Sequence, residues 1–123
     1  MSVKYTPGPW VAAGFWVEHP DENVPDICTC DPRDIDQSSL LRSHSEIEAN
    51  ARLIAAAPDM IAALRVALYH TQMAADRANA LAAWNKRDGK DGIAAEYARL
   101  AAESEQAVKY IRPAITKATG EQA

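Results

Sequence analysis

The sequence predicts an α+β protein, with a small N-terminal antiparallel β-meander followed by a short helix and a long antiparallel helical hairpin. β-Branched and aromatic residues are dense between residues 10 and 30, which favours strands. Apolar residues recur at spacings of three and four beyond residue 45, which indicates helices. We expect one domain over 1–123, with a β-rich part and polar connector over 1–42 and a helical part over 43–123.

Three short strands are predicted in the N-terminal part. Thr6-Pro7-Gly8-Pro9 should form a turn, because proline fixes φ and glycine permits a positive φ. The strands are then expected at 10–12, 15–19 and 24–30. A meander this small needs an apolar surface to pack against, and the helices are the only candidate.

The first helix is predicted over about 45–56. Ser43 and Ser45 each stand three residues before a glutamate, so either could cap this helix, and we favour Ser45. Pro58 lacks an amide donor and is well tolerated at the first position of a helix. We therefore expect a corner before Pro58 and a new helix from there.

The second helix should end near Lys86 and the third should begin at a cap on Asp91, with Gly120 beyond its end. Pro113 predicts a kink or a break near residue 112. The stripe expected to be buried in this hairpin includes Leu81, Ile93 and Leu100.

The predicted hairpin is long and carries few large apolar side chains. The second helix would span about 42 Å at 1.5 Å per residue. Most of the 25 alanines of the chain lie in the helices, and alanine buries little apolar area. We therefore expect the helices to pack on further copies of the chain, as a homo-oligomer.

Charge and hydropathy exclude several classes of partner. The formal net charge is −4, yet residues 45–123 carry ten acidic and ten basic side chains. This neutral hairpin argues against duplex DNA as a partner, because duplex DNA favours a basic face. No stretch approaches the ~18 apolar residues of a membrane span, and the N-terminus has no apolar signal core. We expect a cytoplasmic protein that does not bind membranes.

Residues with catalytic or metal-binding chemistry are present but poorly arranged. Ser43-His44-Ser45 is typical of capping residues, and no nucleophile motif appears. Cys28-Thr29-Cys30 with His19 could supply zinc ligands, together with His44, but the cysteine spacing is wrong for zinc. Reduced thiols on opposite faces of a strand are the simpler interpretation.

The acidic residues Asp31, Asp34 and Asp36 lack the glycine and glutamate of a calcium loop, so a solvated connector is the simpler interpretation. We expect no enzyme activity, no cofactor and no metal.

Aromatic, amide and basic side chains of the chain could bind a small anionic nucleotide. Trp84 precedes Asn85, Lys86 and Arg87, and such a set can stack a base and hold phosphates. The simpler roles are an interface tryptophan, an ion pair of Arg52 with Glu48, and a solvated face around Lys109 and Arg112. The candidate ligand-binding residues are Trp16, Asn50, Arg52, Trp84, Lys109 and Arg112.

Two motifs resemble those of a group of small bacteriophage and prophage proteins: T-P-G-P-W at 6–10 and N-A-R-L-I-A-A-A-P-D at 50–59. The ending R-P-A-I-T-K-A-T at 112–119 is similar to the tail of that group, with Pro113 in place of an alanine. The architecture also looks like that of Thoeris-type anti-defence sponges of phages, small oligomers that sequester cyclic nucleotide signals without cleaving them. The resemblance implies a sponge in the bacterial host cytoplasm for a cyclic oligonucleotide or cyclic ADP-ribose isomer. The alternative is a phage accessory module that binds a host protein.

Overall fold

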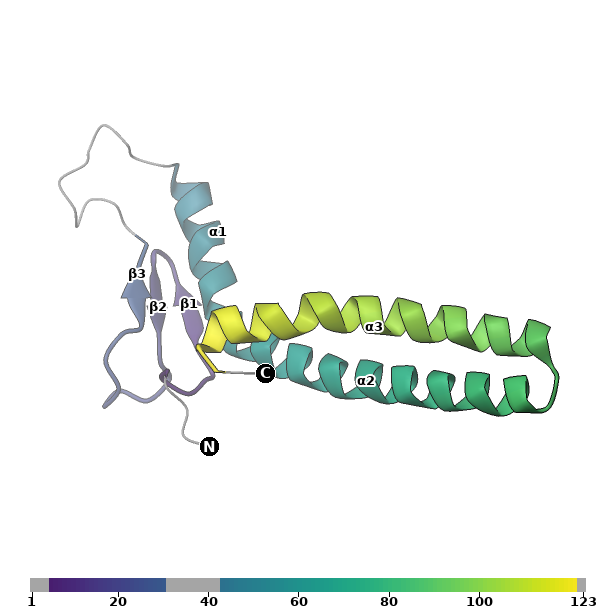
Figure 1. Cartoon of the computed structure of the whole chain (residues 1–123). Coiled ribbons are helices and arrows are strands. Elements are labelled where there is room, and N and C mark those ends of the chain that lie inside the picture. Colours follow the sequence, from purple (N-terminus) through teal and green to yellow (C-terminus); the bar gives the residue numbers. More distant parts are fainter. Residues whose placement is uncertain (1–4, 31–42, 122–123) are drawn as a thin grey trace. The chain divides into compact units, whose positions relative to one another are not determined.

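The computed structural model describes residues 5–30 and 43–121 (Figure 1). Within these described residues, three strands precede three helices, which confirms the predicted α+β fold with a meander, a short helix and a helical hairpin. The residues form two compact units, 1–61 and 62–123. The strands are β1 (Val11–Ala13), β2 (Trp16–Glu18) and β3 (Cys28–Thr29), and the helices are α1 (His44–Ala55), α2 (Ala57–Arg87) and α3 (Asp91–Thr119).

The first unit contains the antiparallel sheet, in the order β1-β2-β3. Val17 pairs with Ala12 on one side and with Cys28 on the other. Gly14, at a φ of 62°, makes the turn between β1 and β2. The third strand is shorter than predicted, because Val24 donates its amide to the Asp21 carbonyl and so closes a turn.

Helix α1 provides the apolar surface that the meander was predicted to need, since it contacts β1 and β2. Val17 of β2 and Ala51 of α1 are both fully buried, and Ala55 completes the cluster. Trp10 and Ile27 pack around these three side chains. The core of the first unit is therefore small and centred on Val17.

The N-cap of α1 is Ser43, and not the predicted Ser45. Ser43 has extended backbone and its hydroxyl accepts a hydrogen bond from the Glu46 amide. This satisfies one of the free amides of the first turn. Ser45 lies inside the helix, where its hydroxyl is within hydrogen-bond distance of that of Ser43.

The two motifs at 6–10 and 50–59 meet in the first unit. A Cβ placed on Gly8 would lie 2.8 Å from the Cβ of Pro58, which is closer than side chains tolerate. Gly8 therefore allows the turn to approach the corner between α1 and α2. The Trp10 indole donates to the Thr6 carbonyl at 3.0 Å and closes the turn. Glycine at position 8 is required by this close approach.

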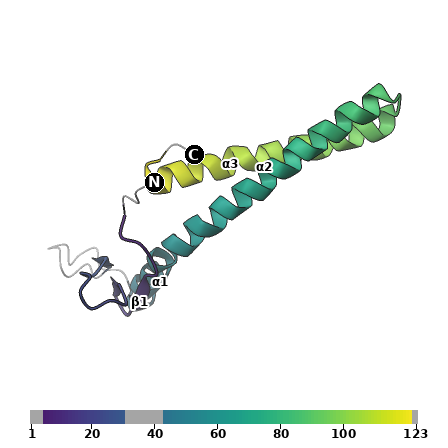
Figure 2. The same ribbon diagram turned by 90° about the horizontal axis from the view of Figure 1, so that it is seen from below.

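The second unit contains the hairpin of α2 and α3, which run antiparallel side by side (Figures 1 and 2). The connection turns at Gly89, whose φ is 76°. The N-cap of α3 is Lys90, without a side-chain hydrogen bond, so the predicted cap Asp91 instead occupies the first turn. Gly120, at a φ of 73°, ends α3 by donating its amide to the Thr116 carbonyl.

Helix α3 continues through Pro113, so the predicted alternative of a break into a final short helix is wrong. Three contacts fix how the two helices face each other. Asn79 donates to Glu105 at 2.8 Å, Arg112 donates to Gln72 at 3.2 Å, and Arg65 pairs with Glu121 at 3.2 Å.

Small side chains occupy the centre of the hairpin. The buried apolar residues of this unit are Ala75, Ala78, Ala94, Ala101, Val108 and Ile115. By contrast, Leu81, Ile93 and Leu100, which were expected to be buried, are exposed. The alanines bring the helices close together and leave these larger side chains outside the contact. In the part of the chain that the structure describes, no helix is long and apolar enough to cross a membrane.

Candidate binding surfaces of the helical hairpin

A groove of about 520 Å³ runs along one face of the hairpin. Met73 and Leu81 of α2 and Leu100 of α3 form its apolar part, and they are 45%, 36% and 40% exposed. His70, Arg77 and Tyr97 add polar and aromatic groups. The groove thus offers an open apolar floor with basic and aromatic side chains on its walls.

The groove lies on a second stripe of side chains, which we call the outer stripe. Along each helix its members recur at spacings of three and four, as expected for a face that packs on another helix. The outer stripe consists of Val66, His70, Met73, Arg77, Leu81 and Trp84 on α2, and Ile93, Tyr97, Leu100, Ser104, Ala107 and Ile111 on α3. None of these residues is buried, whereas the alanines of the inner contact are.

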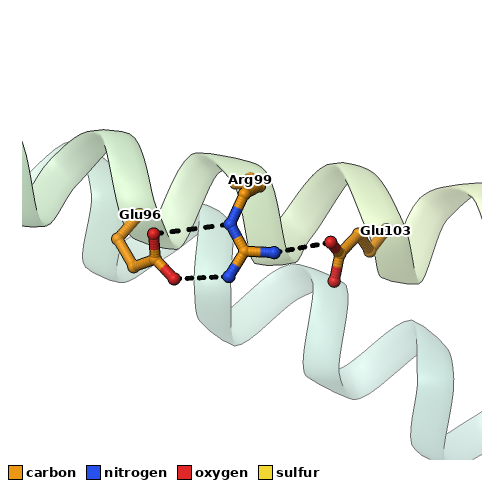
Figure 3. Close-up of polar contacts among 3 residues, drawn as sticks. All are labelled: Glu96, Arg99 and Glu103. Carbon is orange, nitrogen blue, oxygen red and sulfur yellow. Dashed lines mark hydrogen bonds and ion pairs between the residues drawn. The ribbon is translucent and has the colours of Figure 1, made fainter.

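The two walls of the groove differ in charge. On α3, Arg99 donates to Glu96 and to Glu103, the latter at 2.6 Å (Figure 3). The hydrogen bond from Arg99 lowers the pKa of the Glu96 carboxyl, and the same bond raises the pKa of Arg99. Of these three residues, only Glu103 lines the groove, so the α3 wall presents a carboxyl group that Arg99 holds from outside the lining.

The α2 wall is basic. Arg77 lines the groove and forms no ion pair with any residue among 5–30 and 43–121. His70 lines the groove two helical turns earlier, and its ring stands edge-on to Tyr69. The groove therefore has one basic and one acidic wall.

A second surface lies at the end of α2. Trp84 is 61% exposed, and the guanidinium carbon of Arg87 lies 5.8 Å from the centroid of its ring. This distance is within the range of a cation–π contact. The Asn85 amide already has a partner, because it donates to the Leu81 carbonyl of its own helix. We call Trp84 and Arg87 the tip platform.

The six residues predicted to bind a ligand divide between the two units. Trp16 on β2 is largely exposed, Asn50 on α1 is half-buried, and Arg52 is exposed without an ion pair to Glu48 in the described part of the chain. Trp84 belongs to the tip platform.

Lys109 is exposed on α3, and Arg112 is held by Gln72. Twelve residues separate Gln72 from Trp84 on α2, so Arg112 and Trp84 lie about 18 Å apart along the hairpin. The hairpin of one chain does not bring these two residues together.

Three side chains that line the groove, His70, Arg77 and Tyr97, were not among the residues predicted from the sequence to bind a ligand. The available signal was the outer stripe itself. Its spacing runs beside that of the buried alanines, and in the sequence the two stripes merge into one broad apolar band.

The two cysteines are free thiols, and both pack against the cluster around Val17. The prediction that they point to opposite faces is wrong, because side chains two residues apart on an extended chain lie on the same face, and both thiols pack on this cluster. Burial raises the pKa of the Cys28 thiol, and the neighbouring Cys30 adds to this effect.

The histidines considered with these cysteines have other contacts. His19 accepts a hydrogen bond from the Asp21 amide, and His44 stands edge-on to Phe15. Within the described residues, no three His, Cys, Asp or Glu side chains are grouped to hold a metal ion. The acidic residues Asp31, Asp34 and Asp36 lie outside the described residues.

Fold and surfaces together define a small α+β protein whose exposed features, an apolar groove and a tryptophan–arginine pair, are suited to binding. The chain matches the family of the Salmonella phage P22 protein Y8K6 over residues 1–122, and it belongs to that family. This identifies it as a phage protein. No curated protein and no solved structure matches the chain in these comparisons.

Proposed function

We propose that the chain is a non-enzymatic phage accessory protein that sequesters a small anionic nucleotide in the host cytoplasm. The nucleotide class is a cyclic oligonucleotide or a cyclic ADP-ribose isomer that serves as an immune signal of the host. The nucleotide binds where copies of the chain meet, and its removal prevents the immune response of the host. The observation that carries this proposal is the tip platform.

The tip platform has the chemistry that nucleotides require. Stacking of a base on an aromatic side chain contributes about 1–3 kcal/mol, and every base offers a face for it. Arg87 holds a positive charge beside the Trp84 ring, where a phosphate of a stacked nucleotide would lie. Sequestration needs tight binding alone, so no nucleophile has to be present.

One tip platform is too small to enclose a cyclic nucleotide. Lys86 and Lys90 add positive charge near it, but Asp88 and Asp91 oppose them. A second copy would supply another aromatic face and further cations, which is why the proposal places the ligand at a subunit interface. Lys109 and Arg112, and the first-unit residues Trp16, Asn50 and Arg52, remain predicted contacts of that assembly.

Calorimetry against cyclic di- and trinucleotides and cyclic ADP-ribose isomers tests the proposal. We expect one class to bind with a Kd below about 10 μM, which corresponds to about −7 kcal/mol. Trp84→Ala should abolish this binding. Tyr110→Ala is the matched control, since Tyr110 is another exposed aromatic residue of the same hairpin.

Recovery of the intact ligand after denaturation of the complex supports sequestration, whereas a cleaved ligand indicates an enzyme. The proposal is rejected if no nucleotide of the panel binds more tightly than about 10 μM.

A host protein is the second candidate partner, because the outer stripe exposes large apolar side chains. A pull-down from host lysate separates the two functions. A sponge retains a small molecule, whereas an interaction module retains a host protein in stoichiometric amount.

A further inference from the structure

We propose that the groove is the contact surface for a second copy of the chain, with α2 of each copy packed against α3 of the other. The two hairpins then form a four-helix bundle. This inference rests on the oligomer included in the proposed function and identifies the surface through which that oligomer forms.

The inner contact of the hairpin leaves large apolar side chains uncovered. The contact between α2 and α3 buries mainly alanines, whereas Met73, Leu81 and Leu100 stay open to solvent in the groove. A hairpin that functioned alone would be expected to bury its largest apolar side chains first. The outer stripe continues this apolar surface to Val66 on α2 and to Ile93 on α3. Such a long apolar face on both helices matches the extent of a second hairpin.

The charges of the two walls select a copy of the same chain as the occupant of the groove. The α2 wall carries Arg77 without an ion pair in the described residues, and the α3 wall carries Glu103. A two-fold contact uses the same patch on both copies, so a patch that is basic on one side and acidic on the other is self-complementary. In this contact, Arg77 of each copy faces the acidic wall of its partner.

The charges also fix the direction of packing. A two-fold axis parallel to the helices places α2 against α3 of the partner, which joins opposite walls. A two-fold axis perpendicular to the helices places α2 against α2, which brings the two Arg77 side chains together. The first arrangement is favoured, and it brings the two tip platforms to the same end of the bundle.

Analytical ultracentrifugation of the full chain tests the contact surface. We expect a dimer at micromolar concentration, and Leu100→Lys should weaken the dimer at least about tenfold, because it places a charge in the apolar floor. Ala102→Lys is the matched control, since Ala102 is an exposed residue two positions away on α3. A monomer at about 100 μM, or a dimer that both variants leave unchanged, overturns the proposal.

Charge exchange tests the pairing of the walls. Arg77→Glu alone should weaken the dimer at least about tenfold, and Arg77→Glu combined with Glu103→Arg should restore most of the loss. Lys117→Glu is the control for a charge reversal on another exposed position of the hairpin. If the loss of dimer affinity in the double variant equals the sum of the losses in the two single variants, the proposed pairing is wrong.

The packing direction is tested by spin labels on Lys90→Cys in a variant that also carries Cys28→Ser and Cys30→Ser. Residues 62–87 of α2 span about 38 Å, so tips at the same end give label distances below about 25 Å and tips at opposite ends exceed about 40 Å. Circular dichroism checks that the variant keeps its helices. A label distance above about 40 Å refutes the proposed direction of packing.

The outcomes for the dimer and the nucleotide are separable. A dimer that binds no nucleotide retains this inference and rejects the sponge, whereas a nucleotide-binding monomer does the reverse. A stoichiometric host protein that competes with the second copy for the groove overturns the inference.

Discussion

Replacement of Val17 by alanine should destabilise the first unit far more than the same replacement six residues earlier in the chain. Val17 is 0% exposed and is the largest fully buried side chain of the described residues. Its neighbours in the core, Ala51 and Ala55, are too small to move into a vacated space. Val11, on the adjacent strand, is 46% exposed and serves as the matched control.

The magnitude follows from the groups removed. Val17→Ala deletes two methyl groups, worth about 1.6 kcal/mol at about 0.8 kcal/mol each. The cavity left behind adds to this loss, so we expect a decrease of about 2–3 kcal/mol in the free energy of unfolding. Val11→Ala should cost less than about 1 kcal/mol, because that side chain loses little burial and only part of its strand propensity.

Urea unfolding followed by tryptophan fluorescence measures both variants. Trp10 packs on the Val17 cluster and reports on this unit. Hydrogen exchange of the β2 amides gives a second, local readout. Equal losses for Val17→Ala and Val11→Ala would refute the assignment of the core, since burial would then make no difference.

Three further predictions concern the helices. Ser43→Ala should lower the stability of the first unit by about 1 kcal/mol through loss of the N-cap, and Ser45→Ala should lower it less; thermal melts that rank them the other way would contradict this. Pro113→Ala should raise the melting temperature of the hairpin, by an amount that corresponds to about 1–3 kcal/mol, because it restores a helix donor; a lower melting temperature would show that proline is needed there. The pKa of Glu96 should lie below its usual value of 4.5 and rise in Arg99→Gln. The ion pair between Glu96 and Arg99 persists above pH 4.5 and is lost as the pH falls through the lowered pKa of Glu96. An NMR titration of the Glu96 carboxyl measures this pKa. The same titration midpoint in Arg99→Gln would exclude the ion pair in solution.

The sequence patterns predicted the order and type of every element, because each was marked by local chemistry. β-Branched and aromatic residues marked the strands, and Pro58 marked the corner between α1 and α2. Local signals failed where a choice depended on contacts distant in sequence. Ser43 and Ser45 carry the same capping pattern, and the sequence does not show which of them takes the extended backbone of an N-cap.

The candidate surfaces were harder to predict for a geometrical reason. On each helix, the residues that face the other helix of the hairpin and the residues of the outer stripe are only about one position apart in the sequence. Leu100 and Ala101 are neighbours in sequence, and the structure shows that the alanine is the buried one. Sequence periodicity alone favours the larger side chain as the buried one, so the groove was hidden inside a stripe predicted to be core.

The close approach of Gly8 to Pro58 has a consequence for biosynthesis. The turn at Gly8 leaves the ribosome long before the corner at Pro58, so it lacks its final contacts until that corner has been synthesised. A nascent chain released before residue 58 would lack the surface against which its first turn closes. The first turn can therefore close only after the corner at Pro58 has itself emerged from the ribosome.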